Sequence, residues 1–212
     1  DRVAGRSLER RKMGKISTRA VKRIEIMNIG ANLFKEVGYE NATVDEIAKR
    51  ANIDRATLYY YFKGKQELFR EMVNVATADN VTTAEDIAAL DESPESKLRK
   101  LILALFDSYQ QHYPYLYVYL EQDIGRLTLD QSEWSSQILE LNHRFDSAVV
   151  KIIREGREAG IFASRGSDKL LAAGILGMCN WSHRWFKPDG AKKADEIAEI
   201  FADMVLSGIL AR

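Results

Sequence analysis

Polar, aromatic and basic side chains that could bind DNA are concentrated in one short segment of this 212-residue chain. Residues 43–65 read TVDEIAKRANIDRATLYYYFKGK, so that three consecutive tyrosines stand between arginine and lysine residues. Hydroxyl and guanidinium groups can hydrogen-bond to base edges, and cations and tyrosine hydroxyls can contact phosphates. The side chains that we expect to contact DNA in these ways are Arg55, Thr57, Tyr59, Tyr60, Tyr61, Lys63 and Lys65.

Two short helices joined by a tight turn are predicted to position these side chains. Thr43 followed three residues later by Glu46 forms a capping box, which satisfies backbone donors at the start of a helix. Asn52 tolerates the positive φ angle of a sharp turn, and Asp54 can cap the second helix. The apolar positions that we expect to be buried are Val44, Ile47, Ala48, Ala51, Leu58 and Phe62. The pattern predicts a helix-turn-helix, whose second helix enters the major groove of DNA.

An alternative interpretation is that the three tyrosines are only core residues. Three consecutive helical positions span too wide an arc for Tyr59, Tyr60 and Tyr61 all to be buried. We therefore expect the second helix to expose an aromatic and basic face.

The segment resembles the DNA-binding head of TetR/AcrR-type transcriptional repressors. The residues that carry the resemblance are Ala56, Thr57, Leu58, Tyr59, Tyr60, Tyr61, Phe62, Lys65 and Leu68. It extends to an upstream helix from Arg19 to about Val37 and covers roughly residues 18–75 closely. Asn52 is a departure, because relatives usually carry glycine there.

The resemblance implies a role for each side chain of the head. Thr57 and Tyr60 would contact bases, whereas Thr43, Tyr59, Tyr61 and Lys65 would contact the DNA backbone. Arg55 would serve either role, since its guanidinium group can bind guanine in a bidentate manner. Two such heads in a two-fold dimer would read a palindromic operator.

The distribution of charge agrees with a basic head on an acidic body, although the net charge is zero. Residues 1–70 contain 16 Lys and Arg against 9 Asp and Glu, whereas residues 71–212 contain 15 against 22. Residues 1–17 are interpreted as a flexible basic arm. Whether that arm contacts DNA or is only a disordered terminus stays open at this point.

Several other classes of protein find no support in the sequence. The single cysteine, Cys179, excludes an internal disulfide and favours a reducing cytoplasm. We recognise no signal peptide, and the apolar run at residues 170–179 is too short to span a bilayer, so no membrane partner is expected. The three histidines lack metal-ligand spacing and no catalytic constellation is evident, so we expect no metal, no cofactor and no enzymatic activity.

The chain is predicted to be all-α, with a three-helix DNA-binding head followed by a larger helical body. The expected domains are the arm at residues 1–17, the helix-turn-helix domain at 18–64, and a ligand-binding and dimerisation domain at 65–212. Alternating tyrosines between residues 113 and 119 could indicate a strand, but they also satisfy helical spacing. After the head we expect helices at residues 65–80, 94–112, 115–124, 130–159, 167–186 and 191–210.

A dimer interface is predicted in the last two helices. Residues 170–178 are apolar on every side and include small residues that permit close helix approach, which favours a four-helix bundle from two subunits. That arrangement is also the usual dimer of the family. The alternative is a buried core within one subunit.

A ligand site is predicted near residues 180–190. Trp181 and Trp185 are spaced to stack, as are Asn180 and Arg184, and an arginine beside indoles can hold an anionic, ring-bearing group. This string resembles a segment of TetR-type repressors that sense acyl-CoA thioesters of lipid or steroid degradation. Tryptophans packed at the dimer seam are the alternative. Residues that could line a cavity, or be plain core, are Tyr109, Tyr113, Leu116, Tyr117, Leu120, Trp134, Ile138 and Phe145.

The sequence therefore predicts a ligand-responsive, homodimeric repressor of transcription. Its expected partners are double-stranded operator DNA, a second copy of itself, and a small hydrophobic or acyl-CoA-like effector. The alternatives are a small helical enzyme acting on a thioester and a helical adaptor that binds only proteins.

Overall fold

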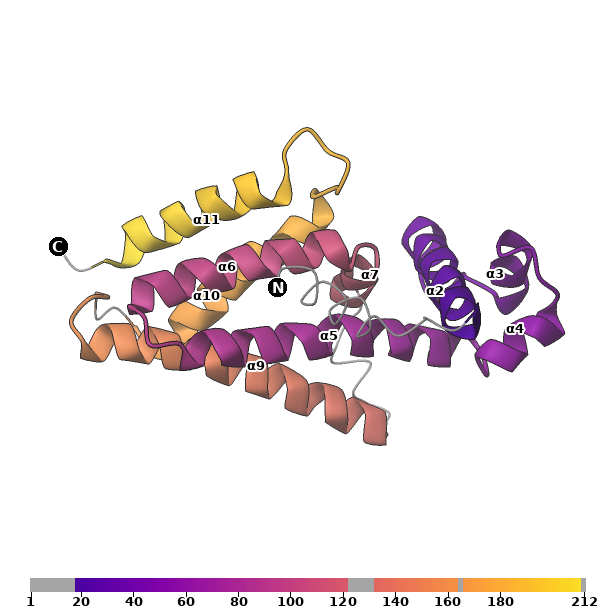
Figure 1. Ribbon diagram of the computed structural model, residues 1–212, viewed down its shortest axis with the longest axis horizontal. Helices are drawn as coiled ribbons and strands as arrows, with labels where there is room; N and C mark the ends of the chain where they lie inside the picture. The colour runs from indigo at the N-terminus through magenta and orange to yellow at the C-terminus, as the bar shows by residue number, and fades with distance from the viewer. Residues whose placement is uncertain (1–17, 122–131, 164–165, 211–212) are drawn as a thin grey trace, which may run out of the picture. The chain divides into compact units, whose positions relative to one another are not determined.

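The computed structural model describes residues 18–121, 132–163 and 166–210. These residues are almost entirely helical, as predicted (Figure 1). Phe162 and Leu210 form an isolated β-bridge. The predicted basic arm at residues 1–17 lies outside the described residues. The helices are α2 (Thr18–Val37), α3 (Val44–Arg50), α4 (Arg55–Tyr61), α5 (Lys65–Ala89), α6 (Pro94–Gln111), α7 (Tyr115–Glu121), α9 (Glu133–Glu158), α10 (Asp168–Asn180), the 3₁₀ helix η1 (Trp181–Arg184) and α11 (Ala194–Ile209).

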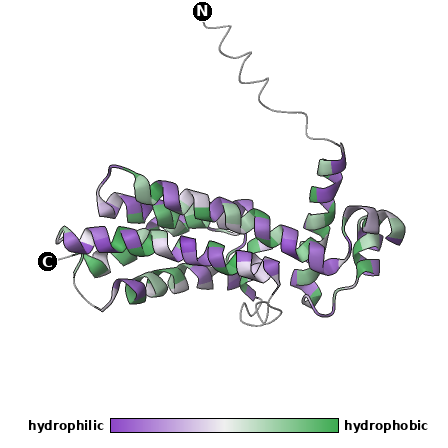
Figure 2. Ribbon diagram, turned by 90° about the horizontal axis from the view of Figure 1, so that it is seen from below, coloured by the Kyte–Doolittle hydropathy of each residue, from purple (hydrophilic) through white to green (hydrophobic). Residues whose placement is uncertain are grey.

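The chain divides into two compact units, one up to Phe69 and one from Arg70 onward. Helix α5 begins in the first unit and continues into the second. Hydrophobic and hydrophilic residues alternate along the helices of both units (Figure 2), which is the pattern of helices that each bury one face.

The first unit packs α2, α3, α4 and the start of α5 around a small apolar core. Gly38 ends α2 with a φ angle of 81°, a conformation in which glycine has no Cβ to clash. The Tyr39 ring then packs between Phe34 and Phe69, with ring centroids 5.2 Å apart in both pairs. The fully or almost fully buried side chains of this unit include Ile26, Leu33, Phe34, Ile47, Leu58, Phe62 and Leu68.

The second unit is organised around α6, which contacts α9, α10 and α11. Ser93 caps α6 by accepting the Ser96 backbone N–H at 3.2 Å, and Pro94 occupies the first turn as predicted. The most deeply buried side chains here include Leu98, Leu101, Ile102, Phe106, Val149, Ile152, Ile153, Ala198 and Ala202. These residues lie at helical spacing, so each helix contributes one apolar face to a common core.

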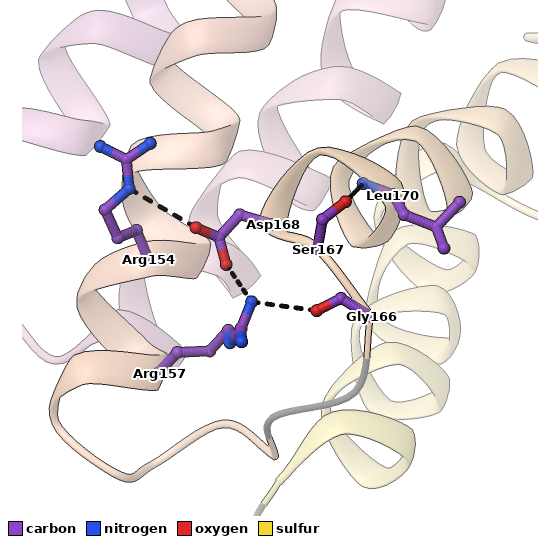
Figure 3. A network of polar contacts seen from close by, with 6 residues as sticks. All are labelled: Arg154, Arg157, Gly166, Ser167, Asp168 and Leu170. Carbon is purple, nitrogen blue, oxygen red and sulfur yellow. Dashed lines mark hydrogen bonds and ion pairs between the residues drawn. The ribbon is translucent and has the colours of Figure 1, made fainter.

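A polar clasp joins the end of α9 to the start of α10 (Figure 3). The Asp168 carboxylate binds Arg157 and, at 3.5 Å, Arg154 Nε, while Arg157 also donates to the Gly166 carbonyl oxygen at 3.2 Å. Ser167 caps α10 by accepting the Leu170 backbone N–H at 3.2 Å. A carboxylate in the first turn of α10 also stabilises the positive end of the helix dipole.

Three predicted helix boundaries differ from the structure. Helix α5 continues to Ala89 instead of ending near Asn80, because the polar stretch still buries Val81, Ala84, Ile87 and Ala88 at helical spacing. Helix α11 begins at Ala194 rather than Ala191.

The helix predicted to reach Phe186 ends at Asn180, where η1 tightens the chain. The Trp185 N–H donates to the Ser182 carbonyl oxygen at 3.1 Å, which is the i to i−3 bond of a 3₁₀ turn. This turn buries Ser182 and Phe186. Two other predicted boundaries, Ile124 and Asp130, lie outside the described residues, and Ser132 is the residue that caps α9.

Candidate nucleic-acid interface and effector pocket

The two N-cap residues predicted from the sequence, Thr43 and Asp54, fix the N-terminal ends of α3 and α4. Thr43 Oγ1 accepts the Glu46 backbone N–H at 3.2 Å, and Asp54 accepts the Thr57 N–H at 2.6 Å. The hydrogen bond from Thr57 holds the pKa of the Asp54 carboxyl below its ordinary value, because it favours the charged form. The Glu46 carboxylate binds Arg50 Nε at 3.1 Å, so the structure confirms the Thr43 half of the predicted capping box.

The turn between α3 and α4 adopts the conformation expected of a helix-turn-helix. Asn52 has a φ angle of 50°, which confirms the prediction that this position requires the left-handed region. The Ile53 backbone N–H donates to the Ala48 carbonyl oxygen at 3.0 Å and closes the turn. The asparagine therefore replaces glycine at modest conformational cost.

Helix α4 buries one face and exposes the other. Leu58 and Phe62 are each 1% exposed, whereas Tyr59 is 43% and Tyr60 is 63% exposed. Tyr61 is half-buried, and its ring meets the Tyr60 ring edge-on at 5.1 Å. The interpretation of all three tyrosines as core residues is therefore wrong, and α4 presents an aromatic face to solvent.

Arginines from α2 as well as from α4 gather around these aromatic rings. The Arg19 guanidinium lies 5.0 Å from the Tyr60 ring centroid, and Arg23 lies 4.3 Å from the Phe62 ring and donates to the Tyr61 carbonyl oxygen. Neither Arg19 nor Arg23 was among the DNA-binding residues predicted from the sequence. A basic series at helical spacing, Arg19, Lys22 and Arg23, was the available signal.

Arg55 is held on the exposed face by an acid and a tyrosine. Its guanidinium group lies 3.2 Å from the Asp45 carboxylate, and Nη2 donates to the Tyr59 hydroxyl at 3.3 Å. The hydrogen bond to Tyr59 is the main cause that raises the pKa of Arg55 above its ordinary value. Asp45 thus occupies one side of the Arg55 guanidinium group.

The two lysines at the end of the segment have different surroundings. Lys65 Nζ donates to the carbonyl oxygens of Tyr39, Glu40 and Ala42 at 2.9, 3.0 and 3.1 Å, which engages all three of its donors. Lys63 is exposed, and its backbone N–H donates to Glu67 at 2.5 Å. In this structure Lys65 therefore holds the segment between α2 and α3, and Lys63 presents its charge to solvent.

The second unit contains a cavity between α5, α6, α7, α9 and the end of α10. Its volume of about 80 Å³ is that of a few water molecules and is well below that of typical ligand pockets. The Tyr109 hydroxyl donates to Asn180 Oδ1 at 2.5 Å, and the Tyr119 hydroxyl bonds to Asn142 within about 3 Å. The lining residues are Thr77, Asn80, Val81, Leu105, Tyr109, Leu116, Tyr119, Leu120, Asn142, Phe145 and Asn180.

The structure brings only part of the predicted ligand-binding set together at this cavity. Tyr109 and Asn180 line it, but Tyr113, Tyr117 and Trp134 lie outside its lining. Tyr117 packs against His183 at 5.9 Å, and Trp134 Nε1 donates to Asn74 Oδ1 at 3.0 Å. The α7 residues that line the cavity are Leu116 and Leu120, as predicted, and Tyr119.

The predicted stacking of Trp181 on Trp185 is wrong, because it required an α-helix through residue 186. Trp181 is 60% exposed and lies 4.6 Å beneath the Arg184 guanidinium, whereas Trp185 packs beside Phe201 at 6.2 Å. Arg184 also lies 3.6 Å from the Glu121 carboxylate. Trp181, Arg184 and the end of α7 therefore form one surface cluster.

An apolar face is exposed along α10 and α11. Leu170, Ile200 and Met204 are each more than half exposed. A Cβ added to Gly174 or Gly177 would meet no atom within 4 Å, so these two glycines are not required for packing among the described residues.

Comparisons with known protein families match both units. The model of the tetR family of bacterial regulatory proteins matches residues 26–72, and a tetracyclin repressor-like C-terminal domain model matches residues 91–209. The chain belongs to the TetR family. A TetR-family protein is a regulator of transcription that binds DNA through its helix-turn-helix head, and it is not an enzyme.

Individual members of the family resemble the chain over most of its length. The transcriptional repressor KstR2 of Mycobacterium tuberculosis is 27% identical over 209 residues, which cover 99% of this chain and 97% of KstR2. The structure of that ketosteroid transcriptional regulator matches with a TM-score of 0.83, at 26% identity over 90% of this chain and 95% of the other.

Two further structures match the TetR fold. PfmR of Thermus thermophilus has a TM-score of 0.75 and 30% identity over 86% of this chain and 97% of PfmR. AibR, solved in complex with isovaleryl coenzyme A and operator DNA, has a TM-score of 0.71 and 20% identity over 86% of this chain and 97% of AibR.

The part of the chain that the structure describes contains no helix long and apolar enough to cross a membrane.

Proposed function

We propose that this TetR-family protein is a dimeric repressor that binds a palindromic operator and is released from it by an acyl-CoA-like effector. The observation that carries the DNA-binding part is the exposed face of α4, where Tyr59 and Tyr60 lie among arginines on a helix capped by Asp54. An exposed aromatic surface with converging cations suits a DNA groove and its phosphates.

Within this surface, Thr57 and Tyr60 are assigned to base contacts. Thr43, Tyr59, Tyr61 and Lys63 are assigned to the DNA backbone, and Arg55 to either role. Lys65, originally expected at a phosphate, is assigned to holding the segment at residues 39–42, because its three donors already bind carbonyl oxygens there.

The proposed partner of the exposed face on α10 and α11 is a second copy of this chain. A two-fold dimer needs one patch that is complementary to itself, and two helices from each copy can form a four-helix bundle. The open space above Gly174 and Gly177 supports close approach of a partner helix at this face.

The proposed effector is a thioester with a hydrocarbon part and an anionic part. The cavity offers apolar walls and two tyrosine hydroxyls, and Arg184 lies 3.6 Å from Glu121, the residue that follows the cavity-lining Leu120. AibR was solved in complex with isovaleryl coenzyme A and operator DNA, which agrees with this class of effector.

Release from the operator follows from linkage between the two ligands. An effector that prefers a conformation unable to bind the operator weakens DNA binding, and DNA weakens effector binding by the same factor. A coupling free energy of roughly 2–3 kcal/mol would change operator affinity some tens-fold to a hundredfold.

The test begins with selection of a palindromic operator from a random DNA library. Fluorescence anisotropy then compares the wild type with the Thr57→Ala/Tyr60→Ala double variant. We expect the double variant to lose at least about tenfold in affinity for the selected operator, because base contacts contribute roughly 1–3 kcal/mol each. Lys192→Ala, in the second unit, is the control and should bind as the wild type does. Unchanged operator binding by the double variant would remove the assignment of α4 as the reading helix.

A further inference from the structure

The carboxylate of Glu121 lies at the end of α7, next to the wall of the cavity. Helix α7 contributes Leu116, Tyr119 and Leu120 to that wall, and Glu121 is its last residue. Glu121 Oε1 lies 3.0 Å from His183 Nε2 and 3.6 Å from Arg184 Nη2. One carboxylate therefore ties the end of α7 to η1.

The His183 ring lies between two oxygen atoms. Nδ1 lies 2.6 Å from the Asn180 carbonyl oxygen, and Nε2 lies 3.0 Å from the Glu121 carboxylate. The imidazole of His183 and the guanidinium cation of Arg184 thus converge on the Glu121 carboxylate.

Asn180 connects His183 to the cavity. Its side-chain oxygen accepts the Tyr109 hydroxyl inside the cavity, and its backbone oxygen accepts His183 outside it. An amphiphile with its hydrocarbon part against Leu116 and Leu120 would therefore place a polar end near His183 and Arg184. Glu121 already occupies that position.

We propose that Glu121 is a built-in competitor of the effector, and that the effector is an anionic amphiphile that replaces it. This inference rests on the proposed function and adds the residue that selects the charge of the ligand. The cavity of about 80 Å³ cannot hold an acyl chain unless a wall moves, and the Glu121 contacts hold the α7 wall in place. A ligand anion that takes over His183 and Arg184 frees the end of α7 and opens the cavity.

The same geometry discriminates against neutral ligands. A neutral group that displaced Glu121 would leave the Arg184 guanidinium without this counter-charge, whereas an anion would replace it. A phosphate or carboxylate can bind the planar Arg184 guanidinium in a bidentate manner, while the indole of Trp181 covers its other side at 4.6 Å. Anions should therefore displace Glu121 more readily than neutral groups of the same size.

The experiment uses Glu121→Gln, which keeps the shape of the side chain and removes its charge. Isothermal titration calorimetry would measure the affinity of the wild type and the variant for octanoyl-CoA, octanoate and 1-octanol. We expect Glu121→Gln to bind octanoyl-CoA about tenfold more tightly than the wild type, because the competing charge is gone. The affinity for 1-octanol should change less than about twofold, since it carries no charge to replace Glu121.

Two further variants are measured in the same way, one as a control and one as a second test. Glu140→Gln, an exposed acid on α9, should leave all three affinities as in the wild type. Arg184→Gln should weaken octanoyl-CoA binding and leave 1-octanol unaffected. Binding by Glu121→Gln alone, with none by the wild type, would support the proposal most directly.

The inference is overturned if Glu121→Gln and the wild type bind octanoyl-CoA equally, or if 1-octanol gains as much affinity as octanoyl-CoA. Absence of binding by both proteins overturns it too, together with the effector part of the proposed function. Operator binding by the same preparation would then leave the DNA-binding part intact, so the two failures are distinguishable.

Discussion

Lys65 contacts Tyr39 in two ways within the first unit, through the tyrosine ring and through the backbone carbonyl oxygen. The Lys65 ammonium group lies 4.6 Å from the centroid of the Tyr39 ring, and it donates a 2.9 Å hydrogen bond to the Tyr39 carbonyl oxygen. Tyr39 in turn packs against Phe34 and Phe69. The lysine therefore fixes the segment that leads into α3, and through α3 it fixes the position of α4.

Lys65→Ala should lower the stability of the first unit. Three carbonyl oxygens lose a charged donor, and hydrogen bonds to charged groups contribute roughly 1.5–3 kcal/mol each, part of which water recovers. We expect a loss of about 2 kcal/mol in the free energy of unfolding, measured by urea denaturation. Lys65→Arg tests whether any cation suffices, and stability unchanged in Lys65→Ala would contradict the assignment.

Lys63→Ala should affect DNA binding and leave stability unchanged. A lysine that neutralises one phosphate contributes about one counterion to the salt dependence of binding. The slope of log K against log salt concentration should therefore become less steep by about 1 in Lys63→Ala. In Lys65→Ala the slope should be that of the wild type, since that ammonium group is engaged within the protein.

Asp45→Asn should strengthen DNA binding. The Asp45 carboxylate lies 3.2 Å from Arg55 on the exposed face and repels phosphates. Its neutralisation releases Arg55 and removes one negative charge from the interface, which we expect to raise affinity roughly three- to tenfold. Anisotropy with the selected operator and with unrelated DNA would show whether the gain is general. Affinity equal to or below that of the wild type would show that Asp45 positions Arg55 productively.

Two glycines allow folding and dimerisation to be tested separately. A Cβ on Gly177 meets no atom within 4 Å, so Gly177→Glu should fold but disrupt the proposed dimer, as measured by analytical ultracentrifugation. A Cβ on Gly156 would lie 2.2 Å from the Phe162 ring, so Gly156→Ala should lower the free energy of unfolding by about 1–3 kcal/mol. A Gly177→Glu protein with unchanged mass in solution would exclude this face as the interface.

Cys179 gives a prediction for alkaline pH. Burial raises the pKa of the Cys179 thiol to about 12 from an ordinary value of 9.0, because the interior disfavours the thiolate. Between these values the folded protein binds more protons than the unfolded chain, so its stability falls as pH rises above about 9. The difference in unfolding free energy between wild type and Cys179→Ala should shrink or reverse over this range. A pH-independent difference would show that the thiol is not desolvated.

The DNA-binding head was predictable because its signals are local. Thr43 and Asp54 cap the helices that directly follow them, and Asn52 forms its turn through its own backbone conformation. The same reasoning predicted the burial of Leu58 and Phe62, since helical spacing decides which side of α4 faces the core.

The body was less predictable because its determinants are far apart in the chain. The end of α10 at Asn180 depends on the burial of Ser182 and Phe186, which no local pattern signals. The orientation of α7 about its own axis determines that Leu116 faces the cavity and that Tyr117 faces His183. Contacts such as Glu121 with His183 join residues 62 positions apart, and one sequence contains no information on that pairing.

The clasp at Asp168 has a consequence for genetics. Replacing this carboxylate leaves two guanidinium groups facing each other and removes the anion from the first turn of α10 (Figure 3). A screen for colonies with permanently derepressed target genes should therefore recover Asp168 substitutions beside those in α4, although Asp168 belongs to the second unit and lies outside the DNA-binding head.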